Sequence, residues 1–299
     1  MAKVLVTGGA GFIGSNLTDE LIKRGHEVLI IDNLSSGKKE HINPEAKFFE
    51  LDLRDFEKIK PVFENVDFVF HVAAVPRIPL SIEKPIETNE ANVTGTLHVL
   101  VASKEAKVKK VIYSSSSSVQ GKQVKMPMKE SGICAPLNPY ALQKYVGELY
   151  SKIFHEIYGL PTVSLRYFNV YGPRQPEKGT YAPIIGKFLS QKAEGKTLTI
   201  TGDGNQTRDF THVSDVVNAN ILAMESEKVG KGEAINIGAG KNYSINQIAE
   251  LIGGETTYIP LPAGEMRDTL ADISLAKELL GWEPKTTLEE GINRLKNEW

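Results

Sequence analysis

The chain has 299 residues, of which 41% are hydrophobic and 24% are charged, and its formal net charge is −2. This length suffices for one large domain or two lobes with a sizeable core. A near-neutral chain lacks the basic field that attracts nucleic acid or anionic membranes, so we expect neither as a partner. One cysteine, Cys134, cannot form an intrachain disulfide, and the six histidines show no metal-ligand spacing.

The beginning of the chain enters a strand pattern at once, without the basic region and apolar stretch of a secretory signal. No apolar run approaches the roughly 18 residues that a membrane-spanning helix needs. We therefore expect a soluble, cytoplasmic protein.

Short β-branched runs alternate with longer helical patterns in the first half of the chain. Each run is nearly continuously apolar, as in strands that are covered on both faces. The alternation predicts an α/β fold with a doubly wound parallel (Rossmann) sheet built from right-handed crossovers. The predicted strands are 3–8, 27–32, 47–52, 67–72 and 110–115, and the clearest predicted helices between them are 11–25 and 88–106.

The composition changes beyond about residue 172. The stretch 171–183 is rich in Gly, Pro and charge and indicates an ordered excursion from the sheet. Further on, 211–226 and 233–240 predict a helix and a strand that return to it. We predict a nucleotide-binding domain over 1–172 and a smaller, discontinuous C-terminal lobe, mainly 173–299, that binds the substrate across a cleft.

A glycine turn follows the first predicted strand. In "VTGGAGFIG", Gly8, Gly11 and Gly14 lie between that strand and the first helix. Glycines here permit a tight turn and a close backbone approach, and the helix N-terminus offers free N–H groups to phosphates. The spacing is a variant of the GxGxxG fingerprint in the context that supports it, so we predict a dinucleotide site.

Asp32 ends the second predicted strand, 18 residues after Gly14. A carboxylate there accepts hydrogen bonds from ribose hydroxyls and repels a 2′-phosphate, so it favours NAD over NADP. The alternative is that Asp32 only caps the turn "DNLSSG". Asp52, at the end of the third strand, is a candidate adenine contact.

Tyr140 and Lys144 of "NPYALQK" are four residues apart and share one face of a helix. A tyrosine with a pKa of about 10 is a poor base near neutrality, and we expect a neighbouring ammonium, with the positive nicotinamide ring close by, to lower that pKa. The pair then accepts a proton from an alcohol while hydride departs.

Five serines, Ser114–Ser118, follow the strand at 110–115. They resemble a linker, but the carboxyl end of a parallel strand is where open α/β sheets bind ligands. We therefore interpret the run as the edge of an active site and predict that Ser116 hydrogen-bonds the reacting oxygen.

Over essentially its whole length the sequence resembles the extended short-chain dehydrogenase/reductase family, most closely its nucleotide-sugar 4-epimerases. The matching stretches are "TGGAGFIG", "DNLSSG", "HVAA", "NVTGT", "SSSSSVQG", "NPYALQK", "RYFNVYGPRQ", "GDGNQTRDFTHVSD" and "GEMRDTLADISLAKELLGW".

The resemblance implies roles for individual residues. The catalytic residues fall on Ser116, Tyr140 and Lys144. The NAD contacts fall on Gly8, Gly11, Phe12, Ile13, Gly14, Asp32, Asn33, Gly37, Asp52, Leu53, Ala73, Ala74, Asn92, Ser114, Tyr140, Lys144 and Tyr167. The contacts to a UDP-sugar fall on Ser116, Tyr140, Asn169, Arg208, Arg267 and Thr269. Paired arginines suit a diphosphate because their planar forks match its oxygens.

The resemblance also implies 4-epimerisation of a UDP-hexose through a transient 4-keto sugar, with tightly bound NAD, and a homodimer built on the helices at about 88–106 and 138–157. In similar epimerases a bulky residue at the position of Thr269 excludes an N-acetyl group, so the smaller threonine predicts that UDP-N-acetylglucosamine is accepted along with UDP-glucose.

Two departures from the family pattern leave alternatives open. Gln120 replaces the tyrosine of "VYG", and Arg77 lies where many epimerases carry small residues near the sugar. Arg77 is compatible with a uronate substrate. A 4,6-dehydratase usually has Asp-Glu where this chain has Ser117 and Ser118. A non-catalytic NAD-binding regulator is the third alternative.

Overall fold

The computed structural model describes residues 1–123, 125–176, 182–260 and 266–297. Residues 177–181 of the predicted excursion and 264–265 of the last matching stretch lie outside the described residues. Within these ranges, no helix is long and apolar enough to cross a membrane.

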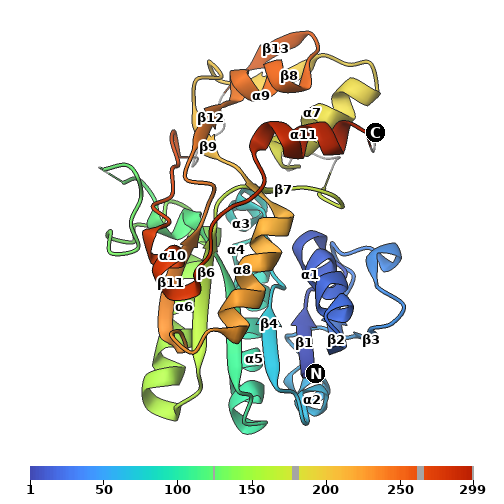
Figure 1. Cartoon of the computed structure of the whole chain (residues 1–299), viewed down its shortest axis with the longest axis vertical. Helices are drawn as coiled ribbons and strands as arrows, with labels where there is room; N and C mark the ends of the chain where they lie inside the picture. Colours follow the sequence, from blue (N-terminus) through green and yellow to red (C-terminus); the bar gives the residue numbers. More distant parts are fainter. Residues whose placement is uncertain (124, 177–181, 261–265, 298–299) are drawn as a thin grey trace.

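A seven-stranded sheet forms the centre of the larger part of the molecule (Figure 1). All neighbouring strands in it run parallel, which confirms the predicted doubly wound sheet. In spatial order the strands are β11 (Lys231–Ile237), β6 (Thr162–Tyr167), β5 (Lys110–Ser116), β4 (Phe68–His71), β1 (Lys3–Thr7), β2 (Glu27–Asp32) and β3 (Lys47–Glu50).

Helices cover both faces of this sheet, and each face has its own hydrophobic core. On one face Leu17 and Val216 pack with strand residues and with Trp282, which is fully buried. On the other face Val99 and Phe154 pack against the opposite side of the same strands. The first face carries α1 (Phe12–Lys23), α8 (Val213–Glu225) and α10 (Ser274–Leu280); the second carries α2 (Phe56–Ile59), α5 (Gly95–Glu105) and α6 (Pro139–Tyr158).

Shorter helical segments connect these elements. They are the 3-10 helices η1 (Lys39–His41), η2 (Lys60–Phe63) and η4 (Ser117–Gln120), the helices α3 (Ile78–Glu83) and α4 (Pro85–Asn89), and the π-helical turn η3 (Glu90–Thr94) that joins α4 to α5.

A smaller group of elements lies beyond the carboxyl ends of the sheet strands (Figure 1). Its three two-stranded pairs are β7 (Val170–Tyr171) with β10 (Thr211–His212), β9 (Thr207–Asp209) with β12 (Asn242–Ser244), and β8 (Leu198–Thr201) with β13 (Thr256–Ile259). Its helices are α7 (Ile184–Ala193), α9 (Ile245–Ile252) and α11 (Leu288–Lys296). They enclose a further core that includes Phe188, Ile248 and Ile292. From here the chain returns to the large sheet through α8 and β11. The predicted domain boundary at residue 172 stays a prediction.

Candidate active site

The serine run extends β5 to the edge of the sheet at which the parallel strands have their carboxyl ends. Ser114, Ser115 and Ser116 pair in register with Leu165–Tyr167 of β6, and the chain then turns into η4. The Ser116 hydroxyl oxygen accepts hydrogen bonds from the amide (3.2 Å) and the hydroxyl (2.9 Å) of Ser118. The run is therefore ordered sheet edge and not a linker.

Helix α6 brings the predicted tyrosine and lysine to this edge. It begins after Asn138, whose side-chain oxygen accepts a hydrogen bond from the Ala141 amide (2.9 Å). Tyr140 forms a side-chain hydrogen bond with Ser116. The Lys144 ammonium donates to the carbonyl oxygen of Ser114 (2.6 Å) and lies 4.9 Å from the centre of the Tyr113 ring. The structure thus brings the three predicted catalytic residues together.

Burial governs the ionisation of this pair. It raises the pKa of Tyr140 to about 12, although the Tyr140 side chain is only half-buried, and it lowers the pKa of Lys144 to about 7. The predicted lowering of the Tyr140 pKa involves the nicotinamide ring of the bound cofactor as well as Lys144, so it stays a prediction. In the chain by itself, removal from water disfavours both the phenolate and the ammonium form.

The glycine turn has the shape that a dinucleotide requires. Gly8 has a φ of +74°, and a Cβ there would lie 2.7 Å from the Ala73 Cα. A Cβ on Gly14 would lie 2.1 Å from the Gly8 carbonyl oxygen. Helix α1 starts at Phe12 and Ile13, and no side chain in the described part of the chain caps its N-terminus. Its first N–H groups therefore suit a pyrophosphate, and the turn fits the predicted cofactor.

Asp32 lies at the end of β2 and is 8% exposed. Its two carboxylate oxygens accept hydrogen bonds from the amides of Ala10 (3.0 Å) and Leu34 (2.8 Å), and burial raises its pKa. The carboxylate thus joins the glycine turn to the turn after β2, and a Cβ on Gly37 of that second turn would lie only 3.0 Å from the Asp32 carboxylate. Each oxygen keeps a lone pair for a ribose hydroxyl.

Asp52 is held by neighbouring side chains. Arg54 binds it with two side-chain hydrogen bonds (3.0 and 2.8 Å), and Asn33 adds a third (2.8 Å), so its pKa lies well below the usual range. An adenine that contacts Asp52, as predicted, must share its carboxylate oxygens with Arg54 and Asn33. Leu53 follows directly and packs near Gly95.

The polar groups of Asn92 and Tyr167 that are predicted to bind the cofactor form hydrogen bonds within the protein. The Asn92 amide accepts from the Val75 N–H (2.7 Å) and donates to Gln143 (2.8 Å), which anchors the loop that includes Ala73 and Ala74. The Tyr167 hydroxyl donates to Asn220 (2.9 Å) and lies 3.0 Å from the Ser114 hydroxyl oxygen. Their contacts with NAD stay predictions.

The residues predicted for the sugar diphosphate gather at the start of the smaller group. Arg208 donates to the carbonyl oxygen of Arg267 (2.8 Å), and the Arg267 side chain is 69% exposed and lies 3.5 Å from the Asp203 carboxylate. Asn169 donates to the Thr269 hydroxyl (3.2 Å), which also accepts from the Asp209 amide (3.2 Å). Thr269 is 2% exposed, so its hydroxyl is part of the local framework.

The two departures from the family pattern have different surroundings. Gln120 is fully buried and donates to the Lys129 carbonyl oxygen (2.8 Å), so it anchors the loop after η4. Arg77 is exposed at the start of α3.

Several buried polar residues that hold the site were not predicted from the sequence. The Ser81 hydroxyl oxygen accepts from the backbone N–H of Tyr140 (3.1 Å), and Gln143 donates to Thr88 (3.0 Å). Glu148 forms a buried ion pair with Arg166 (2.7 Å). Helical spacing alone indicates Glu148, which is four residues after Lys144, but nothing in the sequence pairs Ser81 with Tyr140.

Comparison with known proteins identifies the family to which the chain belongs. Residues 4–238 match the model of the NAD dependent epimerase/dehydratase family. The crystal structure of UDP-glucose 4-epimerase from Thermotoga maritima with UDP-glucose is 42% identical with a TM-score of 0.93, over 97% of this chain and 96% of that one. UDP-N-acetylglucosamine 4-epimerase from Methanobrevibacter ruminantium, in complex with UDP-N-acetylmuramic acid, is 40% identical with a TM-score of 0.93, over 100% and 99% of the chains. UDP-glucuronate 4-epimerase from Thermodesulfobacterium geofontis is 38% identical over 99% of this chain and 96% of its own length.

The chain therefore belongs to the NAD dependent epimerase/dehydratase family, and the three relatives described above are named as UDP-sugar 4-epimerases. The resemblance seen in the sequence is confirmed, as is NAD as the cofactor of the family.

Replacing Asp32 by asparagine separates its two possible roles. We expect Asp32→Asn to weaken NAD binding about tenfold or more, because a charged acceptor is lost. NADP binding should weaken less, because repulsion of the 2′-phosphate is also lost. Calorimetric titration of both cofactors measures the ratio. An equal loss for NAD and NADP would show that Asp32 only shapes the turn.

Proposed function

We propose that the chain catalyses the NAD-dependent 4-epimerisation of UDP-hexoses, interconverting UDP-glucose with UDP-galactose and also UDP-N-acetylglucosamine with UDP-N-acetylgalactosamine. The observation that carries the proposal is the convergence of Ser116, Tyr140 and Lys144 at the carboxyl edge of the sheet. Relatives of about 40% identity that are named for these activities support it.

Each of the three residues has a separate task in this reaction. Tyr140 accepts the proton of the sugar 4-hydroxyl, the Ser116 hydroxyl holds the reacting oxygen, and the Lys144 ammonium stabilises the phenolate. NAD⁺, when bound, takes up the hydride from C4 and later returns it. The 4-keto sugar turns about its link to the diphosphate, hydride returns to the opposite face, and Tyr140 gives the proton back. No net oxidation occurs, so NAD is retained between turnovers.

Dehydration at C5 and C6 is disfavoured by the residues after Ser116. That reaction needs an acid and a base, and Ser117 and Ser118 supply neither a carboxyl nor a carboxylate. A uronate substrate is the second candidate, because Arg77 is an exposed cation near the loop that Asn92 anchors and because one relative is a UDP-glucuronate 4-epimerase.

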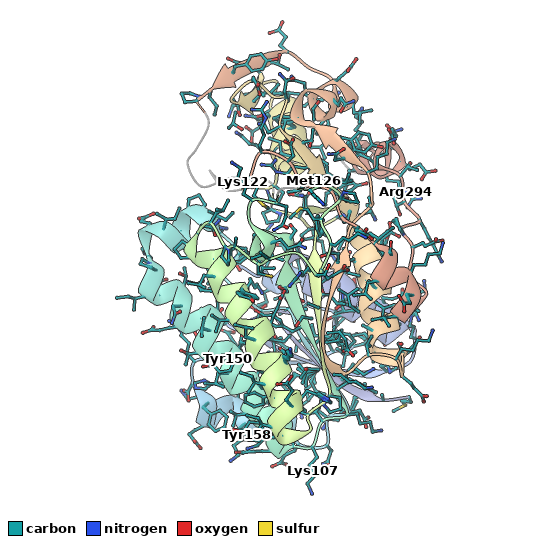
Figure 2. All side chains as sticks on the ribbon, turned by 90° about the vertical axis from the view of Figure 1, so that its left-hand side faces the viewer. Lys107, Lys122, Met126, Tyr150, Tyr158 and Arg294 are labelled. Carbon is teal, nitrogen blue, oxygen red and sulfur yellow. The ribbon has the colours of Figure 1, made fainter. Side chains whose placement is uncertain are left out.

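We also propose a homodimer formed through α6 and its neighbours. Leu142, Leu149, Ile153 and Ile157 form an exposed apolar stripe along α6. Figure 2 shows this helix on one outer side of the molecule, with Tyr150 and Tyr158 along it. Contiguous exposed apolar surface of this kind is typical of an interface. A cytoplasmic location stays a prediction.

Replacing Tyr140 by phenylalanine tests the enzymatic function. We expect Tyr140→Phe to lower kcat by roughly 10²–10⁴-fold on UDP-glucose while NAD stays bound, because only the proton acceptor is lost. Tyr150→Phe, the same change on the outer side of α6, should leave turnover intact. Coupled assays without added NAD measure both variants. Wild-type protein that binds NAD but converts neither UDP-glucose, UDP-N-acetylglucosamine nor UDP-glucuronate would contradict the proposal, and turnover of UDP-glucuronate alone would favour the uronate reaction.

Enlarging Thr269 tests the range of sugars. We expect Thr269→Tyr to abolish turnover of UDP-N-acetylglucosamine and to retain turnover of UDP-glucose, because the larger ring occupies the space of the N-acetyl group. Thr269→Val controls for loss of the hydroxyl that binds Asn169 and should keep both activities. Equal loss of the two substrates in the tyrosine variant would mean that this position does not select the sugar.

A charge in the apolar stripe tests the dimer. We expect wild-type protein to sediment as a dimer and Ile153→Lys to sediment as a monomer, since a buried unpaired ammonium opposes association. Ile133→Lys, at an 84% exposed position in the loop between β5 and α6, is the control and should remain dimeric. A monomeric wild-type protein would refute the interface.

A further inference from the structure

Helix α6 presents a third ionisable residue on the buried side that carries the catalytic pair. Glu148 follows Lys144 by one helical turn, and its side chain is 6% exposed. Arg166 of β6, 4% exposed, binds both of its carboxylate oxygens (2.8 and 2.7 Å). This bidentate geometry holds the carboxylate in one orientation.

The same carboxylate holds the strand that presents the reacting groups. The Ser115 hydroxyl donates to a Glu148 oxygen at 2.5 Å. On either side of Ser115, the carbonyl oxygen of Ser114 accepts from Lys144, and Ser116 hydrogen-bonds Tyr140. Glu148 therefore connects α6, β5 and β6 directly behind the catalytic pair.

Glu148 also supplies negative charge close to Lys144. The other titratable groups that face Lys144 are Tyr140 on α6, Tyr113 on β5 and His71 on β4. Burial keeps these three uncharged near neutral pH, because it raises the pKa of both tyrosines and lowers the pKa of His71 to about 3. The carboxylate of Glu148 acts in the opposite direction to burial and raises the pKa of Lys144.

Stability alone is a weak reason for this arrangement. Two buried charges lose their hydration, and an apolar pair of similar volume is often as stable or more so. An ion pair that fixes the neighbouring strand and keeps a catalytic lysine charged has a further role in the reaction.

We propose that Glu148, oriented by Arg166, is a positioning residue for the catalytic pair: its carboxylate keeps Lys144 in the ammonium form and fixes the end of β5 that carries Ser114 and Ser116. The kinetic part of this proposal rests on the proposed epimerase function. Its electrostatic part concerns the chain itself and can be measured without turnover.

The experiment follows the ionisation of Lys144 in the full chain. Lysine labelled with ¹³C at Cε is incorporated, the Lys144 signal is assigned by its loss in Lys144→Met, and the signal is titrated in wild-type protein and in Glu148→Gln/Arg166→Gln. The double variant removes both charges and leaves no unpaired ion. We expect its Lys144 midpoint to move to lower pH by about one pH unit.

The alkaline limb of kcat should move to lower pH by the same amount, because that limb reports loss of the ammonium. Ser115→Ala separates geometry from charge: the Lys144 midpoint stays and kcat falls several-fold at unchanged KM. Ser164→Ala is the matched control, since the Ser164 hydroxyl on β6 is buried without a hydrogen-bond partner among the described residues, and it should change neither quantity.

An unchanged Lys144 midpoint in the double variant would overturn the electrostatic role, and wild-type kcat in Ser115→Ala would overturn the geometric role. If the double variant does not fold, Glu148→Asp takes its place. It retains the charge but withdraws it from Lys144, so the midpoint should move in the same direction by less, and a wild-type midpoint there overturns the proposal equally. Absence of turnover in every protein would count against the epimerase function and leave the titration decisive for Glu148.

Discussion

Parallel strand pairing is the constraint on which the rest of this molecule depends. In a doubly wound parallel sheet all strands end at one edge, and the chain must cross back over a face before each new strand begins. The glycine turn after β1, Asp32 at the end of β2 and the serines at the end of β5 therefore reach the same edge, although they are far apart in sequence. The smaller group of elements, which carries residues predicted to bind the sugar diphosphate, lies beyond this edge (Figure 1).

Burial at this edge sets the chemistry as much as the identity of the residues does. Burial favours the neutral forms of both Tyr140 and Lys144. Transfer of a proton from the sugar hydroxyl to Tyr140 instead requires a phenolate beside an ammonium. Other charges therefore have to favour the ionised forms: the Glu148 carboxylate favours the ammonium of Lys144, and bound NAD⁺ would supply a positive charge that favours the phenolate of Tyr140. On this view the pair becomes an effective base only when the cofactor is in place, because the chain alone holds Tyr140 as a phenol near neutral pH.

The sheet and the catalytic residues could be predicted because their signals are local. The strands are short apolar runs, Gly8 requires a positive φ, and Tyr140 and Lys144 share a helix face by spacing alone. The residues that hold them could not be predicted in the same way. Ser81 binds the Tyr140 amide from α3, and Arg166 reaches Glu148 from a different strand, so both partnerships exist only after folding. The burial that raises the pKa of Tyr140 in the chain by itself could not be predicted for the same reason: sequence shows the neighbouring charge but not the loss of water.

The residues proposed for the reaction and those proposed for sugar preference lie in different parts of the chain. This explains why the type of reaction is easier to infer than the preferred sugar. Ser116 lies at the end of β5, and Tyr140 and Lys144 lie on α6, which are regular elements of a fold that this chain shares with solved UDP-sugar 4-epimerases. Arg77 lies in a connection, and Thr269 lies in an irregular segment before α10, where substitutions leave the sheet unchanged. Relatives named for glucose, N-acetylglucosamine and glucuronate derivatives are accordingly all within about 38–42% identity of this chain. Overall similarity therefore does not separate these sugars.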